Sequence, residues 1–329
     1  MRRLTLLLTS IALSFALSAQ TTELRLISTA WSPFTNEPGK PRFALDLVEE
    51  GLNRIGVKSR TAIVDAAQFT PLLQSGEFDG SAAAWKDAER ERTLLFSQPY
   101  LENRLILVAR SGGDVSATKF ADLKGKRIAI VEGYAYGDAI DQSGPIFVRS
   151  RSEEDSLKLL LDSKVDYTLM DELVVEYIVN NYAQQARTRL QFGSTPLVTR
   201  QLYLALRRDL PDADSIITRF NAQLRGMITD HTYHRLLHVD WILVDVDGDG
   251  IPEYVPKSDT PGSVEPKHAY NLFSSELSSI TTRPRSDQRF LIGGSVYDGW
   301  TTVPDRFKVE DPKRPDPNRS TAVIFRFVW

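Results

Sequence analysis

The chain has 329 residues, a formal net charge of −3 at pH 7 and no cysteine. At roughly 100–200 residues per domain this length predicts at least two domains, and the interspersed charges exclude a surface built for nucleic acid or an anionic membrane. Without cysteine the chain has neither a disulfide nor an acceptor thiol for a lipid anchor. We therefore expect a monomer whose partners are small molecules or proteins.

The first nineteen residues have the pattern of a secretory signal peptide. Met1, Arg2 and Arg3 are followed by a mostly apolar run from Leu4 to Leu17, and then by small residues at 18–19. The run is shorter than the roughly 20 residues that a membrane-spanning helix needs. The pattern predicts export, removal of residues 1–19, and a periplasmic protein without a lipid anchor.

From Glu23 onward, short β-rich runs alternate with amphipathic helical stretches. We predict strands at 24–27, 59–64, 80–84, 105–109, 127–131 and 167–170, and helices at 44–55, 69–74, 136–140, 153–162, 173–181 and 213–229. Alternation of this kind predicts an α/β fold.

Two breaks divide this pattern. Ser111-Gly112-Gly113 lies between strand-rich regions, and Gly193-Ser194-Thr195-Pro196 follows some eighty residues later. Glycine and proline clusters of this kind mark places where the chain turns or bends. We predict a discontinuous first lobe of residues 20–110 and 195–240, a second lobe of residues 111–194, and a cleft between them.

Beyond Trp241 the composition changes to proline, serine, threonine, aspartate and arginine with short apolar runs. We predict an irregular or β-rich C-terminal appendage of residues 241–329. The alternating stretch Thr321–Trp329 is expected to be an edge strand or a small β extension, because a single strand cannot close a membrane barrel.

A candidate Ca²⁺ loop lies near the start of the appendage, at residues 245–253. Asp245, Asp247 and Asp249 alternate along the chain, and Gly250 occupies the sixth position. This spacing wraps carboxylate oxygens around one hard cation. Since a helix–loop–helix site would need an acid where Pro256 stands, Glu253 would have to close the site. The alternative is an Asp-Gly-rich turn without a metal.

Several short motifs follow one another in order and at characteristic spacing: Thr29–Phe34, Phe43–Leu47, Gly76–Gly80, Glu89-Arg90 with Phe96–Tyr100, Asp122–Arg127, Gly133 and Val165–Asp171. Together they make residues 23 to about 240 resemble the bacterial extracellular solute-binding proteins of family 3. The resemblance implies the type II periplasmic-binding-protein fold, with two α/β lobes joined by a two-crossing hinge. It also implies capture of an amino-acid-like ligand for an ABC permease in the inner membrane.

The resemblance assigns two charged residues to the ligand. Arg90 matches the arginine that grips the ligand's α-carboxylate, a role suited to a planar guanidinium with a fork of N–H donors. Asp171 matches the acid that receives the α-ammonium group. The alternatives are that Arg90 belongs to the solvated charged run 86–92 and that Asp171 caps the helix beginning near Leu173.

The remaining predicted ligand contacts are Trp31, Ala83, Trp85, Gly133, Tyr134 and Ala135. Trp31 replaces the tyrosine or phenylalanine that is usual in the family, and its ring would pack on the ligand. Trp85 and Tyr134 depart from the family, which commonly has serine or threonine at those positions. We expect these aromatic rings to narrow the pocket or to favour a flat or apolar ligand.

These features predict a binding protein without catalysis and without a required cofactor. One alternative is a cleft enzyme, dehydratase-like or lyase-like, which would need a proton-transfer residue such as Glu132, Glu172 or Asp87. The other alternative is a ligand-sensing receptor that docks to a partner through the appendage.

Overall fold

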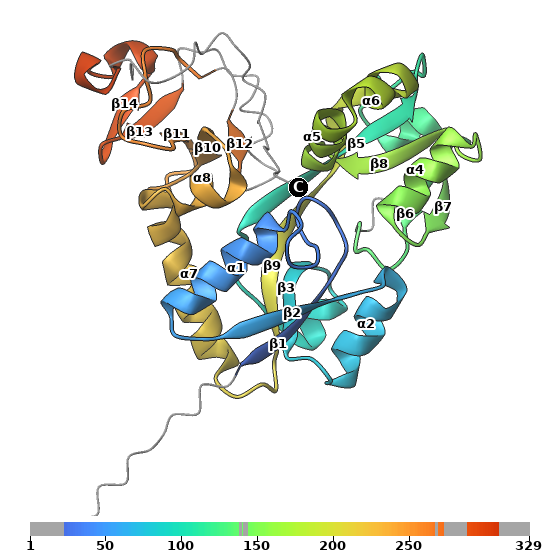
Figure 1. The fold of residues 1–329 in the computed structure, drawn as a ribbon, viewed down its shortest axis with the longest axis horizontal. Helices are drawn as coiled ribbons and strands as arrows, with labels where there is room; N and C mark the ends of the chain where they lie inside the picture. The colour runs from blue at the N-terminus through green and yellow to red at the C-terminus, as the bar shows by residue number, and fades with distance from the viewer. Residues whose placement is uncertain (1–22, 138–139, 141–143, 267–268, 273–287, 309–329) are drawn as a thin grey trace, which may run out of the picture.

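The computed structural model describes residues 23–137, 140, 144–266, 269–272 and 288–308; the predicted signal peptide and the stretch 321–329 lie outside them. The described chain forms one large mixed sheet flanked by helices, followed by a smaller sheet. In Figure 1 the elements of the large sheet fall into two groups, and the smaller sheet lies beside α8.

The first group contains β1 (Leu24–Thr29), α1 (Phe43–Arg54), β2 (Ser59–Val64), α2 (Ala66–Ser75), β3 (Gly80–Trp85), the 3₁₀ turn η1 (Arg90–Arg92), β4 (Leu94–Phe96) and α7 (Ala213–Thr229). β1 lies between β2 and β3, parallel to both. Leu45, Val48 and Leu52 of α1 recur at helical spacing and are fully buried. A Cβ atom at Gly51 would lie 2.6 Å from the Phe220 ring, so this glycine permits the close approach of α1 and α7.

The second group contains η2 (Phe120–Leu123), β6 (Arg127–Val131), β7 (Ile146–Ser150), α4 (Glu153–Leu161), β8 (Tyr167–Asp171), α5 (Glu172–Asn181) and α6 (Ala183–Arg189). β6 lies between β7 and β8 and is parallel to both. β6 and β8 are almost fully buried, as expected for strands covered on both faces, whereas β7 is partly exposed.

Two long antiparallel strands, β5 (Leu101–Arg110) and β9 (Leu190–Arg207), connect the groups. β5 pairs with β8 of the second group, and the C-terminal part of β9 pairs with β3 and β4 of the first group. The first predicted lobe boundary, after residue 110, falls at the end of β5, and the second, after residue 194, falls inside β9. The division into lobes remains a prediction.

The predicted break at residues 193–196 does not interrupt the strand. β9 continues through it, and Pro196 pairs opposite Ile106 where the register of β5 and β9 shifts. Proline has no N–H to give to the ladder, so strands accommodate it at bulges. The glycine and proline signal therefore marks an irregularity within a strand.

The predicted β-rich appendage is a sheet of its own. After α8 (Thr232–Leu237) come β10 (Trp241–Val244), β11 (Glu253–Pro256), β12 (Tyr270–Asn271), β13 (Arg289–Ile292), β14 (Ser295–Asp298) and the 3₁₀ turns η5 (Trp300–Thr302) and η6 (Asp305–Phe307). The order is β12-β10-β11-β13-β14. Phe290, Ile292 and Val303 form its buried core. The imidazole of buried His234 lies 2.8 Å from the Val255 carbonyl oxygen and ties α8 to this sheet.

Among the described helices, none combines the length and the apolar character needed to cross a membrane.

Candidate ligand-binding cleft

A small cavity lies between the two groups of elements. Its walls are Ser28, Thr29, Trp31, Ala66, Phe69, Ala83, Trp85, Arg90 and Leu202 from the first group and β9, and Gly133, Tyr134 and Ala135 from the second. The cavity volume is about 40 Å³. Seven of the eight predicted ligand contacts therefore lie on one cavity, and Asp171 does not.

Arg90 reaches across the cleft from η1. Its Nη1 donates to the Trp85 carbonyl oxygen at 2.8 Å, and its Nη2 donates to the Gly133 carbonyl oxygen in the opposite group at 3.1 Å. Only 11% of the side chain is exposed, and burial lowers the pKa of the guanidinium, with nearby Asp87 acting in the opposite direction. Arg90 Nε lies 3.7 Å from Asp87 Oδ2, and the side chain lines the cavity.

Three of the aromatic rings that line the cavity contact one another. Trp31 and Trp85 meet edge to face with ring centroids 5.5 Å apart, and Tyr134 contacts Trp31 at 5.9 Å and Trp85 at 5.4 Å. The Tyr134 hydroxyl lies 3.2 Å from Thr29 Oγ1, which joins the two groups by a hydrogen bond. Tyr134 follows Gly133, whose φ of +78° and close approach to the Ala66 carbonyl oxygen (3.0 Å from an added Cβ) favour glycine. The rings of Trp31, Trp85 and Tyr134 fill space that smaller side chains would leave open.

Asp171 lies behind this wall, fully buried at the end of β8. One carboxylate oxygen accepts from the Leu173 N–H at 2.8 Å and caps α5; the other accepts from Asn103 Nδ2 at 3.2 Å and from the Arg104 N–H at 2.9 Å. Burial, opposed by these donors, raises its pKa to about 8. Trp85 Nε1 donates to Asn103 Oδ1 at 2.7 Å, so Trp85 and Asn103 stand between Asp171 and the cavity. The capping role is visible in these contacts, and the ammonium-binding role remains a prediction.

Sequence reasoning missed a different acid at the cleft, Glu153. It is the first residue of α4, and its Oε1 accepts from Trp31 Nε1 at 2.8 Å. Acidic residues are common in the first helical turn because they complement the helix dipole, so the sequence carries no signal that separates Glu153 from its exposed neighbour Glu154.

The three acids considered for proton transfer do not line the cavity. Asp87 Oδ1 accepts from the Arg90 N–H at 2.7 Å, Glu132 is exposed, and Glu172 lies 3.1 Å from Arg104 Nε as an ion pair.

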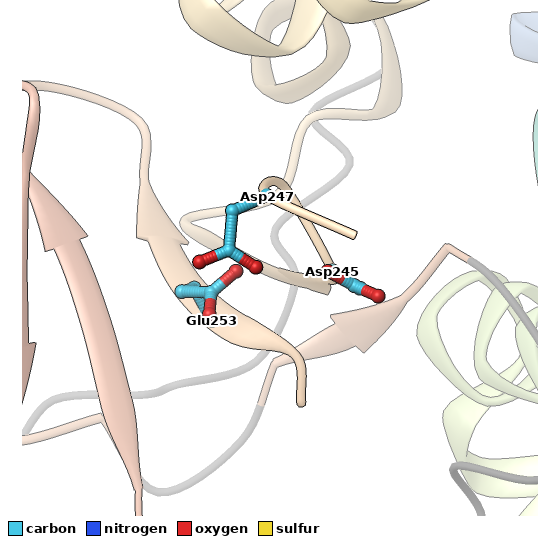
Figure 2. A group of neighbouring side chains, drawn as sticks. All are labelled: Asp245, Asp247 and Glu253. Atoms are coloured by element: carbon cyan, nitrogen blue, oxygen red, sulfur yellow. The ribbon is translucent and has the colours of Figure 1, made fainter. Parts of the chain in front are cut away.

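The acidic loop of the appendage brings three of its four predicted ligands together. One oxygen each from Asp245, Asp247 and Glu253 lie within 4.8 Å of one another, and Figure 2 shows the carboxylates of Asp247 and Glu253 facing each other. An all-oxygen set of this kind suits Ca²⁺. Arg289 Nη1 donates to Asp249 at 2.5 Å and to Glu253 Oε1 at 3.5 Å, so a cation of the protein engages Asp249 and also contacts one of the three clustered acids.

Residues 26–242 match the bacterial extracellular solute-binding proteins, family 3. The chain belongs to this family. The match ends at the start of the small C-terminal sheet, which is an addition to the family's domain.

Three curated relatives illustrate how this domain is used. The virulence sensor protein BvgS of Bordetella bronchiseptica is 33% identical over 113 residues, which cover 33% of this chain and 9% of BvgS. The ABC transporter arginine-binding protein 1 of Escherichia coli is 28% identical over 45% of this chain and 59% of its own length. The membrane-bound lytic murein transglycosylase F of Ectopseudomonas mendocina is 27% identical over 69% of this chain and 47% of its own length. This chain thus matches less than two thirds of each.

Among solved structures, an ancestral arginine-binding protein bound to arginine aligns with a TM-score of 0.55 at 25% identity, covering 65% of this chain and 96% of the other. The chain therefore has the type II periplasmic-binding-protein fold, and the predicted fold class is confirmed. Its family and structural neighbours are ligand-binding proteins.

Proposed function

We propose that the chain captures a small amino-acid-like carboxylate between its two lobes in the periplasm and delivers it to an ABC permease. The observation that supports this most is the buried guanidinium of Arg90, which lines the cavity and contacts both groups of elements. A largely buried guanidinium is well suited to a carboxylate, because it can donate two parallel charge-assisted hydrogen bonds. The ABC transporter function of the E. coli relative supports delivery to a permease.

The hydrogen bonds across the cleft imply that ligand capture requires movement. The bonds that cross the cleft, from Arg90 to Gly133 and between Thr29 and Tyr134, must open for a ligand to enter. Binding then favours whichever closed arrangement the ligand contacts best.

A thermal-shift screen against amino acids, opines, amines and small carboxylates tests the proposal. A ligand at a hundred times its Kd adds about 2.7 kcal/mol to the free energy of unfolding. We expect carboxylates to stabilise the parent and the Arg92→Ala variant, since Arg92 is exposed on the same turn, but not Arg90→Ala. Equal stabilisation of all three proteins by a carboxylate contradicts the role of Arg90.

A second candidate function is ligand sensing, and the match to the BvgS sensor favours it. In this alternative the appendage docks to a signalling partner. Deletion of residues 242–329 distinguishes the two: unchanged ligand affinity with loss of partner capture supports sensing, whereas loss of folding shows that the appendage completes the core.

We also propose that the loop 245–253 binds Ca²⁺ through Asp245, Asp247 and Glu253. Added Ca²⁺ should raise the melting temperature of the parent and leave that of Asp247→Ala unchanged, because Asp247 is an exposed ligand whose loss spares the fold. A parent whose stability does not respond to Ca²⁺ contradicts the proposal.

A further inference from the structure

The contact between Trp31 and Glu153 joins elements far apart in the chain. Trp31 follows β1 in the first group, and Glu153 begins α4, which covers β6, β7 and β8 in the second. The 2.8 Å hydrogen bond from Trp31 Nε1 to Glu153 Oε1 therefore crosses the cleft.

The surroundings of Glu153 are unusual for an acid in a first helical turn. Ser152 caps α4 by accepting from the Asp155 N–H, so Glu153 is not needed as a cap. Its Oε2 is shielded from solvent and has no hydrogen-bond partner among the described residues, although the residue as a whole is half-buried. Leaving a buried polar atom unpaired costs free energy. Helix stability alone does not account for this placement.

The partner of Glu153 is a wall of the cavity. The Trp31 ring contacts Trp85 and Tyr134, and all three line the same space. An indole ring has one N–H donor, so a bond from that donor fixes which edge of the ring faces Glu153. The ring held in this way is the one that contacts Trp85 and Tyr134.

We propose that Glu153 is a positioning residue for the ligand site: from the second lobe, it fixes the orientation of the Trp31 ring that completes the cavity wall. The wall then takes its binding shape only when the two lobes are together. The relevance of this to ligand binding rests on the proposed function, whereas the positioning itself is measurable without a ligand.

The indole N–H resonances of the ¹⁵N-labelled full chain provide the test. The chain has five tryptophans, and the Trp31→Phe variant identifies the Trp31 signal by its disappearance. Glu153→Ala should shift this signal and speed its exchange with solvent by about tenfold, as expected for the loss of a bond worth roughly 1.4 kcal/mol. Glu153→Gln keeps an acceptor and should restore the parent signal.

Glu154→Ala is the matched control, because Glu154 is an exposed acid in the same helical turn. It should leave the Trp31 signal unchanged. A Trp31 signal that is the same in Glu153→Ala as in the parent, or that changes equally in Glu154→Ala, overturns the positioning role.

Titration with L-arginine, L-glutamine and L-glutamate separates this inference from the proposed function. If one of them binds, Glu153→Ala should weaken its binding by about tenfold while Glu154→Ala does not, and equal affinities overturn the link to ligand binding. If neither these nor the other carboxylates of the screen bind, the proposed function fails, and with it that link, while the indole signal still decides whether Glu153 positions Trp31.

Discussion

Replacing Asp171 by alanine separates its observed structural role from its predicted ligand role. The substitution removes the acceptor for three donors: the Leu173 N–H, the Arg104 N–H and the Asn103 amide. Loss of the helix cap costs about 1 kcal/mol, and each further unpaired buried donor costs about 1–3 kcal/mol. Burial of the Asp171 carboxyl group itself costs free energy, and the substitution removes that cost. The net destabilisation is therefore about 3 kcal/mol.

Chemical and thermal denaturation measure this loss. At roughly 2–4 °C per kcal/mol for a domain of this size, we expect the melting temperature to fall by about 6–12 °C. Asp162→Ala is the control, because Asp162 is 48% exposed and pairs only with a surface lysine at the end of α4; it should cost at most about 0.5 kcal/mol. An Asp171→Ala protein as stable as this control would refute the structural role and would leave Asp171 available for a ligand.

Three further effects on stability follow from buried contacts. Trp85→Phe leaves the Asn103 side-chain oxygen without its indole donor and should lower the free energy of unfolding by about 1–3 kcal/mol in denaturant titrations; an unchanged midpoint would show that another donor replaces it. Gly80→Ala places a Cβ atom 2.0 Å from the Ala205 carbonyl oxygen, so a soluble variant with parental melting temperature would contradict the β3–β9 pairing. Burial raises the pKa of Glu102 to about 7, so the folded state retains a proton that the unfolded state releases, and this group's contribution to stability should fall between about pH 4.5 and pH 7 by up to about 3 kcal/mol. Glu102→Gln should flatten that part of the pH profile, and an unaltered slope would rule out Glu102 as its source.

The regular elements could be predicted because their signals are local. The α7 helix and the strands β2 and β6 begin and end where apolar periodicity placed them. The irregularity of β9 at Pro196 could not be predicted in this way. It depends on pairing with Ile106, which lies in a strand ninety residues earlier in the chain. A glycine–proline cluster predicts a departure from regularity, and only the pairing decides whether it is a bulge or a chain break.

Which residues line the cavity could be predicted where a motif fixes the backbone, but the absence of Asp171 from that lining could not, because side-chain packing decides it. Arg90, Trp31 and Tyr134 follow strands or turns that direct them to the cleft, and all three line the cavity. The path from Asp171 to that cavity is occupied by Trp85 and Asn103, which is a matter of side-chain size and orientation. Such packing depends on the whole neighbourhood and has no periodic signal in the sequence.

The central claim, that Arg90 grips a ligand carboxylate, is tested most directly by calorimetric titration with matched ligands that differ only in the α-carboxylate. L-Arginine with agmatine and L-glutamate with 4-aminobutyrate are two such pairs. The claim predicts that at least one amino acid binds the parent, and that loss of its carboxylate weakens binding to the parent by at least about tenfold but leaves binding to Arg90→Ala unchanged. Binding of neither amino acid, or an equal loss of affinity in the parent and in Arg90→Ala, would contradict it.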